Sequence, residues 1–119
     1  MFTGYGDDHV LINHQRYDVA SLLITPNAIV PEWTVIGGFT GLTSDHFAAM
    51  LAQQPEVVLL GTGRQLQFPH PQLSAPLINA GIGLEVMDSK AACRTYNILA
   101  SEGRRVVIGL LLDHPSVQP

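Results

Sequence analysis

Apolar residues near the start of the chain cluster in two short runs separated by a polar break. The runs His9–Asn13 and Arg16–Thr25 are rich in Val, Ile, Leu and Tyr, which favour β-strands. The break between them, Asn13-His14-Gln15-Arg16, is polar and has the length of a turn. This pattern predicts an N-terminal β-hairpin.

A loop and a short strand are predicted next. Pro26 and Pro31 bound a looped segment, because proline cannot donate a backbone hydrogen bond to a neighbouring strand. The segment Trp33–Ile36 then has the composition of a short strand, and the Gly37-Gly38 pair ends it.

After position 42 the apolar residues recur at the spacing of a helix. Phe47, Met50 and Leu51 are three and four residues apart, and the Thr-Ser pair at 43–44 can cap the start of a helix at either residue. Pro55 ends this helix, because proline removes a backbone hydrogen bond from a helix interior.

A buried strand and a second helix follow. The run Val57–Leu60 is short and uninterrupted, which is typical of a strand covered on both faces, as in parallel sheets. The second helix is expected to end near Ala80, with Gly81 as its left-handed cap. Its start is open because of Pro76: either the helix begins near Leu73-Ser74, or it is kinked.

The last third of the chain repeats the alternation of strand and helix. Leu84–Met87 is predicted to be a strand, Asp88 or Ser89 the next cap, and Lys90–Glu102 a third helix. Val106–Leu112 is predicted to be a final buried strand, and residues 113–119 a frayed tail.

This order of elements indicates the fold class. Helix and strand alternate three times after the hairpin, and such alternation is typical of α/β domains with right-handed crossovers. We therefore predict a single three-layer α/β domain over residues 1–119, with its core at about 5–112. Its central sheet is expected to be mostly parallel with alternating helices, and the N-terminal β-hairpin is expected to pack beside it.

Composition and charge narrow the classes of function. The chain has 119 residues, of which 46% are hydrophobic and 13% charged, so it can bury a core. Its net charge is −4 and its 6 Lys and Arg are scattered, which excludes the broad basic surface of a nucleic-acid binder. Its apolar runs are shorter than the roughly 18 to 20 residues that span a bilayer. We expect no binding to nucleic acid and no membrane insertion.

The N-terminal segment bears on localisation. Met1–Val10 contains two acids where a signal peptide has basic residues followed by an apolar core, and it lacks the Arg and Ser bias of an organellar presequence. The sequence therefore predicts a cytoplasmic protein. Its oligomeric state is open.

Three loops qualify as places for a site. Ligands of open α/β sheets bind beyond the carboxyl ends of the parallel strands. The loops expected at that edge are residues 61–70, 88–90 and 113–114. Arg104 and Arg105 precede their strand, so they are expected at the opposite edge.

The first of these loops can bind an anion. Gly61 and Gly63, followed by Arg64, can form a backbone concavity with a guanidinium beside it, which suits a phosphate or a carboxylate. Lys90 and Arg94 are expected close enough to assist. The alternative is that both glycines only permit a sharp exit from the strand.

Known phosphate motifs are incomplete in this loop. The dinucleotide pattern G-x-G-x-x-G fails because Leu66 occupies the place of the third glycine, and the P-loop pattern is absent. Ser74 and Ser89 lack the G-x-S-x-G context of a nucleophile elbow. The sequence therefore predicts no catalytic constellation and no cofactor.

Cys93 is the only cysteine, which excludes an internal disulfide and is compatible with a reducing compartment. It lies between Lys90 and Arg94, which can favour a reactive thiolate, although a lone cysteine is also a common small residue of a buried core. The histidines are dispersed without metal-ligand spacing, so we expect no metal site. They are His9, His14, His46, His70 and His114.

Two further features concern the surface. Glu85 interrupts an apolar strand, so its carboxylate lies either at an exposed edge or in an ion pair with Arg94 or Arg104, and the pair is the favoured interpretation. Phe68 and Pro69 lie in a loop, where they can contact a partner or cover an end of the core.

A family resemblance rests on two stretches. They are Gly61-Thr62-Gly63 with Phe68-Pro69, and the segment GIGLEVMDSKAACRTYNILASEGRRV at positions 81–106. Over about 33–112 the chain resembles the small family of Mth938-type domains, which includes the mitochondrial respiratory complex I assembly factor and the adipogenesis-associated domain protein. The matching residues are Gly61, Gly63, Cys93, Arg94, Thr95, Tyr96, Asn97, Arg104 and Arg105.

The resemblance implies a compact three-layer α/β fold without an established enzymatic activity. For the mitochondrial members it implies a role in building the peripheral arm of complex I through contacts with other assembly proteins. It settles no catalytic role for the matching residues. Because this chain starts without a presequence, the resemblance suggests a bacterial relative.

Three hypotheses follow from the sequence. The preferred one is a non-enzymatic interaction or assembly-factor-like module that holds a protein partner, with Phe68 and Arg64 as contacts. The second is a small-molecule anion or phosphate binder, or an enzyme, with its site at the carboxyl ends of the strands. The third is thiol chemistry at Cys93.

Overall fold

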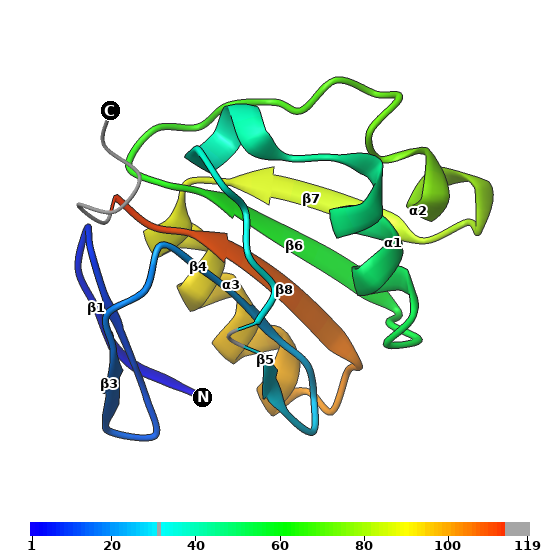
Figure 1. Ribbon diagram of the computed structural model, residues 1–119. Coiled ribbons are helices and arrows are strands. Elements are labelled where there is room, and N and C mark those ends of the chain that lie inside the picture. The colour runs from blue at the N-terminus through cyan, green and yellow to red at the C-terminus, as the bar shows by residue number, and fades with distance from the viewer. Residues whose placement is uncertain (31, 114–119) are drawn as a thin grey trace.

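The computed structural model describes residues 1–30 and 32–113, which form two β-sheets with helices on both faces of the larger sheet (Figure 1). The smaller sheet is antiparallel and has the order β1-β2-β3. Its strands are β1 (Phe2–Tyr5), β2 (Val10–Ile12) and β3 (Gln15–Tyr17). The larger sheet has the order β5-β4-β8-β6-β7. Its strands are β4 (Ser21–Ile24), β5 (Ile29–Val30), β6 (Val57–Thr62), β7 (Gly83–Met87) and β8 (Val106–Leu111).

The predicted N-terminal hairpin is confirmed as the β2–β3 pair. Asn13 and His14 connect its strands with φ values of 50° and 70°, as the primed turns of two-residue hairpins require. The predicted second strand is too long, because β3 ends at Tyr17 and Ser21–Ile24 forms β4 in the other sheet. The sequence patterns did not predict β1 or the two-residue β5.

The prediction of a mostly parallel central sheet is wrong. β6 pairs in parallel with β7 and β8, whereas β4 pairs antiparallel with β8 and with β5. Over both sheets, four of the six pairings are antiparallel. An uninterrupted apolar run indicates burial on both faces, and that burial is compatible with either strand direction. The four residues of β4 are all buried beside β8.

The three predicted helices are present, together with a 3₁₀ helix. The helices are α1 (Ser44–Leu51), α2 (Ala75–Asn79) and α3 (Ser89–Ser101), and the 3₁₀ helix is η1 (Gly38–Gly41). Thr43 caps α1, and Asp88 caps α3 by accepting a hydrogen bond from the backbone N–H of Ala91 at 2.9 Å. Pro76 lies in the first turn of α2, as the first of the two alternatives for this helix predicts.

The helices divide the molecule into layers. α3 and the smaller sheet cover one face of the larger sheet, while η1, α1 and α2 cover the other (Figure 1). Each face has its own hydrophobic core. Phe47 and Met50 of α1 are fully buried in one core, and Ala92 and Cys93 of α3 are fully buried in the other.

The prediction of a short strand at Trp33–Ile36 is wrong, although buried and exposed side chains alternate along this segment as they do in a strand. Trp33 and Val35 are buried, and Ile36 is 84% exposed. Among the described residues, no strand pairs with this segment in a ladder. Instead, the hydroxyl of Ser21 donates to the carbonyl of Trp33 and accepts from the N–H of Val35, both at 3.1 Å. One buried side chain thus replaces a strand ladder.

The predicted frayed tail lies almost wholly outside the described residues. Asp113 is described, and its backbone N–H donates to the carbonyl of Asp7 at 2.8 Å. Residues 114–119, including His114, lie outside the described ranges.

Asn97 of α3 attaches the N-terminal strand to the rest of the fold. Its side-chain oxygen accepts from the N–H of Phe2, and its side-chain nitrogen donates to the carbonyl of Phe2, both at 2.8 Å. The ring of Phe2 packs edge-on against Tyr96 with ring centroids 5.3 Å apart. The side-chain amide of Asn97 therefore pairs with both backbone groups of Phe2, as the backbone of a neighbouring strand would.

The substitution Asn97→Asp is expected to lower the free energy of unfolding by about 1–3 kcal/mol, because it removes the donor and places a carboxylate against the carbonyl of Phe2. Urea unfolding measures the loss. Asn27→Asp is the control, since it adds the same charge at an exposed turn. Equal stability losses in the two variants would contradict this role of Asn97.

Candidate functional site

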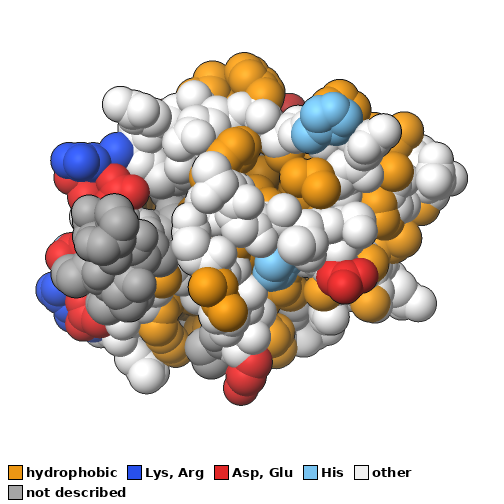
Figure 2. Space-filling model, turned by 45° about the horizontal axis from the view of Figure 1, so that its top comes forward, with side chains coloured by type: hydrophobic (Ala, Val, Ile, Leu, Met, Phe, Trp, Pro, Cys, Tyr) orange, Lys and Arg blue, Asp and Glu red, His pale blue; other side chains and the backbone are white. Residues whose placement is uncertain are grey.

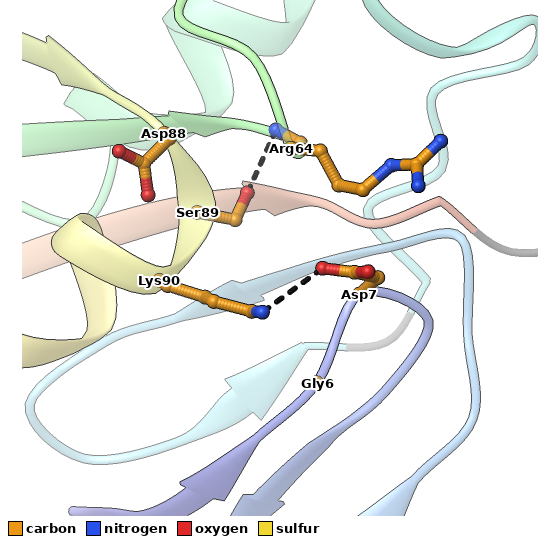
Figure 3. Close-up of a pocket in the computed structure, with 7 residues that line it drawn as sticks. Gly6, Asp7, Arg64, Asp88, Ser89 and Lys90 are labelled. Carbon is orange, nitrogen blue, oxygen red and sulfur yellow. Dashed lines mark hydrogen bonds and ion pairs between the residues drawn. The ribbon is translucent and has the colours of Figure 1, made fainter.

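The carboxyl ends of β6 and β8 meet the start of α3, and two adjoining hollows lie there, the first of which is drawn in Figure 3. One hollow has a volume of about 200 Å³, and the other has a volume of about 280 Å³. The first is lined by Gly6, Asp7, Gly63, Arg64, Asp88, Ser89 and Lys90. The second is lined by Thr62, Arg64, Gln65, Gln67 and Asp113. Residues from all three predicted strand-end loops therefore meet at this edge.

Ser89 connects the three elements that form the edge. Its hydroxyl accepts a hydrogen bond from the backbone N–H of Gly63 at 2.9 Å and donates one to the carbonyl of Leu111 at 2.6 Å. Its backbone N–H donates to the carbonyl of Gly63 at 2.9 Å. Ser89 is 5% exposed, so these bonds are shielded from water. The first residue of α3 thus holds the ends of β6 and β8 together.

Positions 61 and 63 of the first loop each favour glycine, for two different structural reasons. A Cβ on Gly61 would lie 2.8 Å from the hydroxyl and 3.0 Å from the Cα of Ser89, so α3 can approach β6 only over a glycine. Gly63 has a φ of +93°, which favours glycine. Because the N–H of Gly63 already donates to Ser89, it is not free to bind an anion.

The charged side chains of the edge are arranged as ion pairs. Nε of Arg64 lies 2.6 Å from a carboxylate oxygen of Asp113, and Nζ of Lys90 lies 3.1 Å from one of Asp7 (Figure 3 shows the second pair). Asp88 uses its carboxylate to cap α3. Both cationic side chains are about half exposed or more, so each pair contributes little to stability.

The other predicted basic residues are placed differently. Arg94 is exposed on α3 and does not line either hollow. Arg104 and Arg105 lie near the amino end of β8, where each is 3.8 Å from Glu56. The structure therefore brings Gly63, Arg64 and Lys90 together and leaves Arg94 outside the group.

The prediction that Glu85 forms an ion pair with Arg94 or Arg104 is wrong. Glu85 is exposed on β7, one of the two edge strands of the larger sheet. Its expected partner Arg104 lies near Glu56 instead, and among residues 1–30 and 32–113 no ion pair includes Glu85. An edge strand lets a charged side chain reach water, which makes a partner unnecessary.

Cys93 faces the core between α3 and the larger sheet. It is 0% exposed, and burial raises the pKa of its thiol to about 12, although the nearby positive charge of Arg94 acts in the opposite direction. A thiol that is shielded from water and neutral at physiological pH is a poor nucleophile. This environment favours the alternative of a small core residue.

The loop after β6 is open to solvent, and Phe68 within it is 72% exposed. Pro69 beside it is partly buried. In the described part of the chain, no group of three or more His, Cys, Asp or Glu side chains lies close enough to hold a metal ion.

The sequence predicted the edge at which these residues meet, but it did not predict their ion pairs and hydrogen bonds. The partners of Arg64 and Lys90, which are Asp113 and Asp7, come from distant parts of the chain and carry no local signal. The role of Ser89 had a partial signal, since a serine after the Asp88 cap begins a helix at the predicted edge.

The substitution Ser89→Ala is expected to lower the free energy of unfolding by about 1–3 kcal/mol, because the N–H of Gly63 and the carbonyl of Leu111 lose a buried partner. Amide exchange at Gly63 should accelerate as well. Ser101→Ala is the control, since that exposed hydroxyl donates only to Ile98 within the same helix. If both variants unfold at the same urea concentration, Ser89 does not have this role.

The chain matches a known protein family and curated relatives. A family model described as "Protein of unknown function (DUF498/DUF598)" matches residues 2–111. The mouse NADH dehydrogenase (ubiquinone) 1 alpha subcomplex assembly factor 3 is 36% identical over 95 residues, covering 78% of this chain and 49% of the relative. The 13 kDa major membrane protein of Francisella tularensis is 28% identical over 105 residues, covering 88% and 85%. The chain spans about half the length of the assembly factor.

Solved structures show the same fold. A crystal structure of a Bordetella parapertussis protein has a TM-score of 0.84 and 38% identity, covering 95% of both chains. A solution structure of a Bordetella pertussis protein, described as an Mth938-like domain, has a TM-score of 0.74 and 31% identity, covering 96% of this chain and 86% of that one. Within the described residues, every helix is too short or too polar to cross a membrane. The chain therefore belongs to the DUF498/DUF598 family of Mth938-like domains, as the resemblance in its sequence predicted.

Proposed function

We propose that this chain is a non-enzymatic interaction module of the assembly-factor type, which binds a partner protein on one face that carries almost no charge. This neutral face is the exposed surface of segments 36–51 and 65–79, which contain η1, α1, α2 and the loop before α2. The observation that supports the proposal is the exposure of large hydrophobic side chains on a face almost free of charge.

The charges of the molecule are distributed unevenly. The chain has 6 Lys and Arg and 10 Asp and Glu, and Asp45 alone falls within the neutral face. Figure 2 shows hydrophobic side chains over the upper and right parts of the view, where this face lies, and the visible Lys and Arg side chains at the left end, with further single acidic side chains at the right and at the lower edge. Depletion of charge is typical of the core of a protein interface.

Exposed large hydrophobic residues concentrate on the same face. Ile36 is 84% exposed and Phe68 is 72% exposed, and Leu66 and Ile78 are both more than half exposed. Apart from Met1 and Ile98, these are the large hydrophobic side chains exposed in the described residues. Burying an aromatic side chain such as Phe68 against a partner releases the water that now covers it.

The relatives support a protein partner. Several are named as assembly factors of NADH dehydrogenase, which is a name for proteins that act on other proteins. The Francisella relative is named a membrane protein, and a membrane-bound partner would account for that name without a spanning helix in the part of this chain that the structure describes. The cytoplasmic location and bacterial source expected from the sequence stay predictions.

The substitution Phe68→Asp is expected to weaken partner binding at least tenfold, because it places a charge at the centre of an apolar contact. Affinity capture from the native host, quantified by mass spectrometry, compares the variant with the unsubstituted chain. Urea unfolding should show little change, since Phe68 makes few contacts in the isolated domain.

Gln15→Asp is the matched control, because it adds the same charge to an exposed position of β3, away from the neutral face. The proposal predicts that partners captured by the unsubstituted chain are retained by Gln15→Asp and lost by Phe68→Asp. Retention of every reproducible partner by Phe68→Asp would reject this face as the binding surface.

A second candidate function rests on a different observation. Gly63, Arg64 and Lys90 line one hollow at the carboxyl ends of the strands, which is where an α/β sheet binds ligands. An anionic ligand would compete with Asp113 for Arg64 and with Asp7 for Lys90. The structure supports binding of a phosphate or carboxylate only if the ligand displaces these carboxylates.

Thermal unfolding with inorganic phosphate, nucleotides and small carboxylates tests the second candidate. A ligand at about ten times its Kd should raise Tm by several degrees, and Arg64→Ala should abolish the rise. Arg104→Ala is the control, since this exposed arginine lies away from the hollow, beside Glu56. If none of these anions raises Tm, the anion site is rejected.

A further inference from the structure

The strand β7 has a free edge. It is the last strand of the larger sheet, and among residues 1–30 and 32–113 it pairs with β6 alone, over Gly83–Met87. In a five-residue edge strand, alternate N–H and C=O groups point away from the sheet and can pair with an added strand. This edge is distinct from the neutral face and from the hollows.

The side chains of β7 differ between the two faces of the sheet. Leu84 and Val86 are partly buried and pack with the core beneath α1 and α2. Met87 packs with the core beneath α3. Because side chains alternate along a strand, Glu85 points to the same side as Met87, where α3 lies. One side of the edge is therefore apolar, and the other carries a single negative charge.

The α3 side also presents an exposed apolar residue. The hydroxyl of Thr95 donates to the sulfur of Met87 at 3.4 Å, so this side of α3 faces β7. Ile98 follows Thr95 by three residues, on the same side of the helix, and is 59% exposed. A strand added at β7 would bring its side chains beside Ile98 as well as Glu85.

A second copy of the chain fits this edge poorly. Two β7 strands related by a two-fold axis pair over their full length only with Glu85 opposite Glu85. Like charges directly opposite each other destabilise a strand pair. An added strand with a lysine or arginine at that position would instead pair with a carboxylate that has no ion-pair partner among the described residues.

We propose that the free edge of β7 binds an extended segment of a partner protein by β-strand addition, with a lysine or arginine opposite Glu85 and apolar side chains beside Leu84 and Val86. Backbone hydrogen bonds would supply much of the affinity, and Glu85 would select the basic residue. The proposal does not depend on the neutral face.

A palindromic peptide tests this proposal. In Thr-Val-Thr-Val-Lys-Val-Thr-Val-Thr the lysine is central, so it comes opposite Glu85 whichever direction the peptide takes. Its valines then share the side of Leu84 and Val86. The comparison peptides carry glutamate in place of the lysine, or the lysine with N-methylated backbone amides.

The measurement is an amide NMR titration of the folded protein. The lysine peptide should shift the amides of residues 83–87 and bind about two- to fivefold more tightly than the glutamate peptide. The variant Glu85→Lys should reverse this order, and the N-methylated peptide should not bind. Because Glu85 is exposed, the substitution leaves the core intact, as the spectrum of the variant will verify.

Three results would overturn the proposal: no binding of the lysine peptide, shifts outside the β7 edge, or an order of affinities that Glu85→Lys leaves unchanged. Phe68→Asp should bind the peptides as the unsubstituted chain does. A failure of strand addition and a failure of the neutral face are therefore distinguishable.

Discussion

The close contact between the first turn of α3 and the end of β6 is the constraint on which the rest of the fold depends. α3 approaches β6 so closely that position 61 has no room for a Cβ, and the hydroxyl of Ser89 then satisfies the N–H of Gly63, just after β6, and the carbonyl of Leu111 in β8. All six residues of β6 and all six of β8 are buried. Unpaired polar groups at these strand ends would be costly, and one serine hydroxyl satisfies two of them.

The same contact limits what the strand-end edge can bind. The N–H of Gly63 donates to Ser89, Asp88 caps α3, and Arg64 and Lys90 face carboxylates. Polar groups that in a nucleotide-binding protein would face a ligand are here used within the protein. Two other surfaces of the described residues, the neutral face and the outer edge of β7, present exposed hydrophobic side chains or backbone groups without a strand partner, and both proposals place a protein partner there.

The sequence was informative wherever a structural signal is local. The caps and spacing of α1 and α3, and the apolar runs of β6 and β8, were predicted because each depends on neighbouring residues. The parallel pairing of β6 with β7 and β8 was expected, whereas the antiparallel pairing of β4 with β8 was not, because the sequence pattern places the residues of β4 in the hairpin. The segment at 33–36 has the alternation of a strand, but Ser21 supplies the hydrogen bonds of a ladder from twelve to fourteen residues away. The meeting of the strand-end loops followed from topology, whereas the partners of Arg64 and Lys90 depend on long-range packing.

The residues that carry the family resemblance have clear structural roles. Within positions 92–97, the side chains of Cys93 and Tyr96 are buried on the inner face of α3, and the side chain of Asn97 forms two hydrogen bonds with the backbone of Phe2. Gly61 permits the approach of α3 to β6. A match over Gly61, Cys93, Tyr96 and Asn97 therefore points to the fold, because these residues serve packing or backbone hydrogen bonding. Phe68 and Glu85 belong to the same stretches but are exposed, so packing does not explain them, and they are the positions on which the two proposed partner contacts depend.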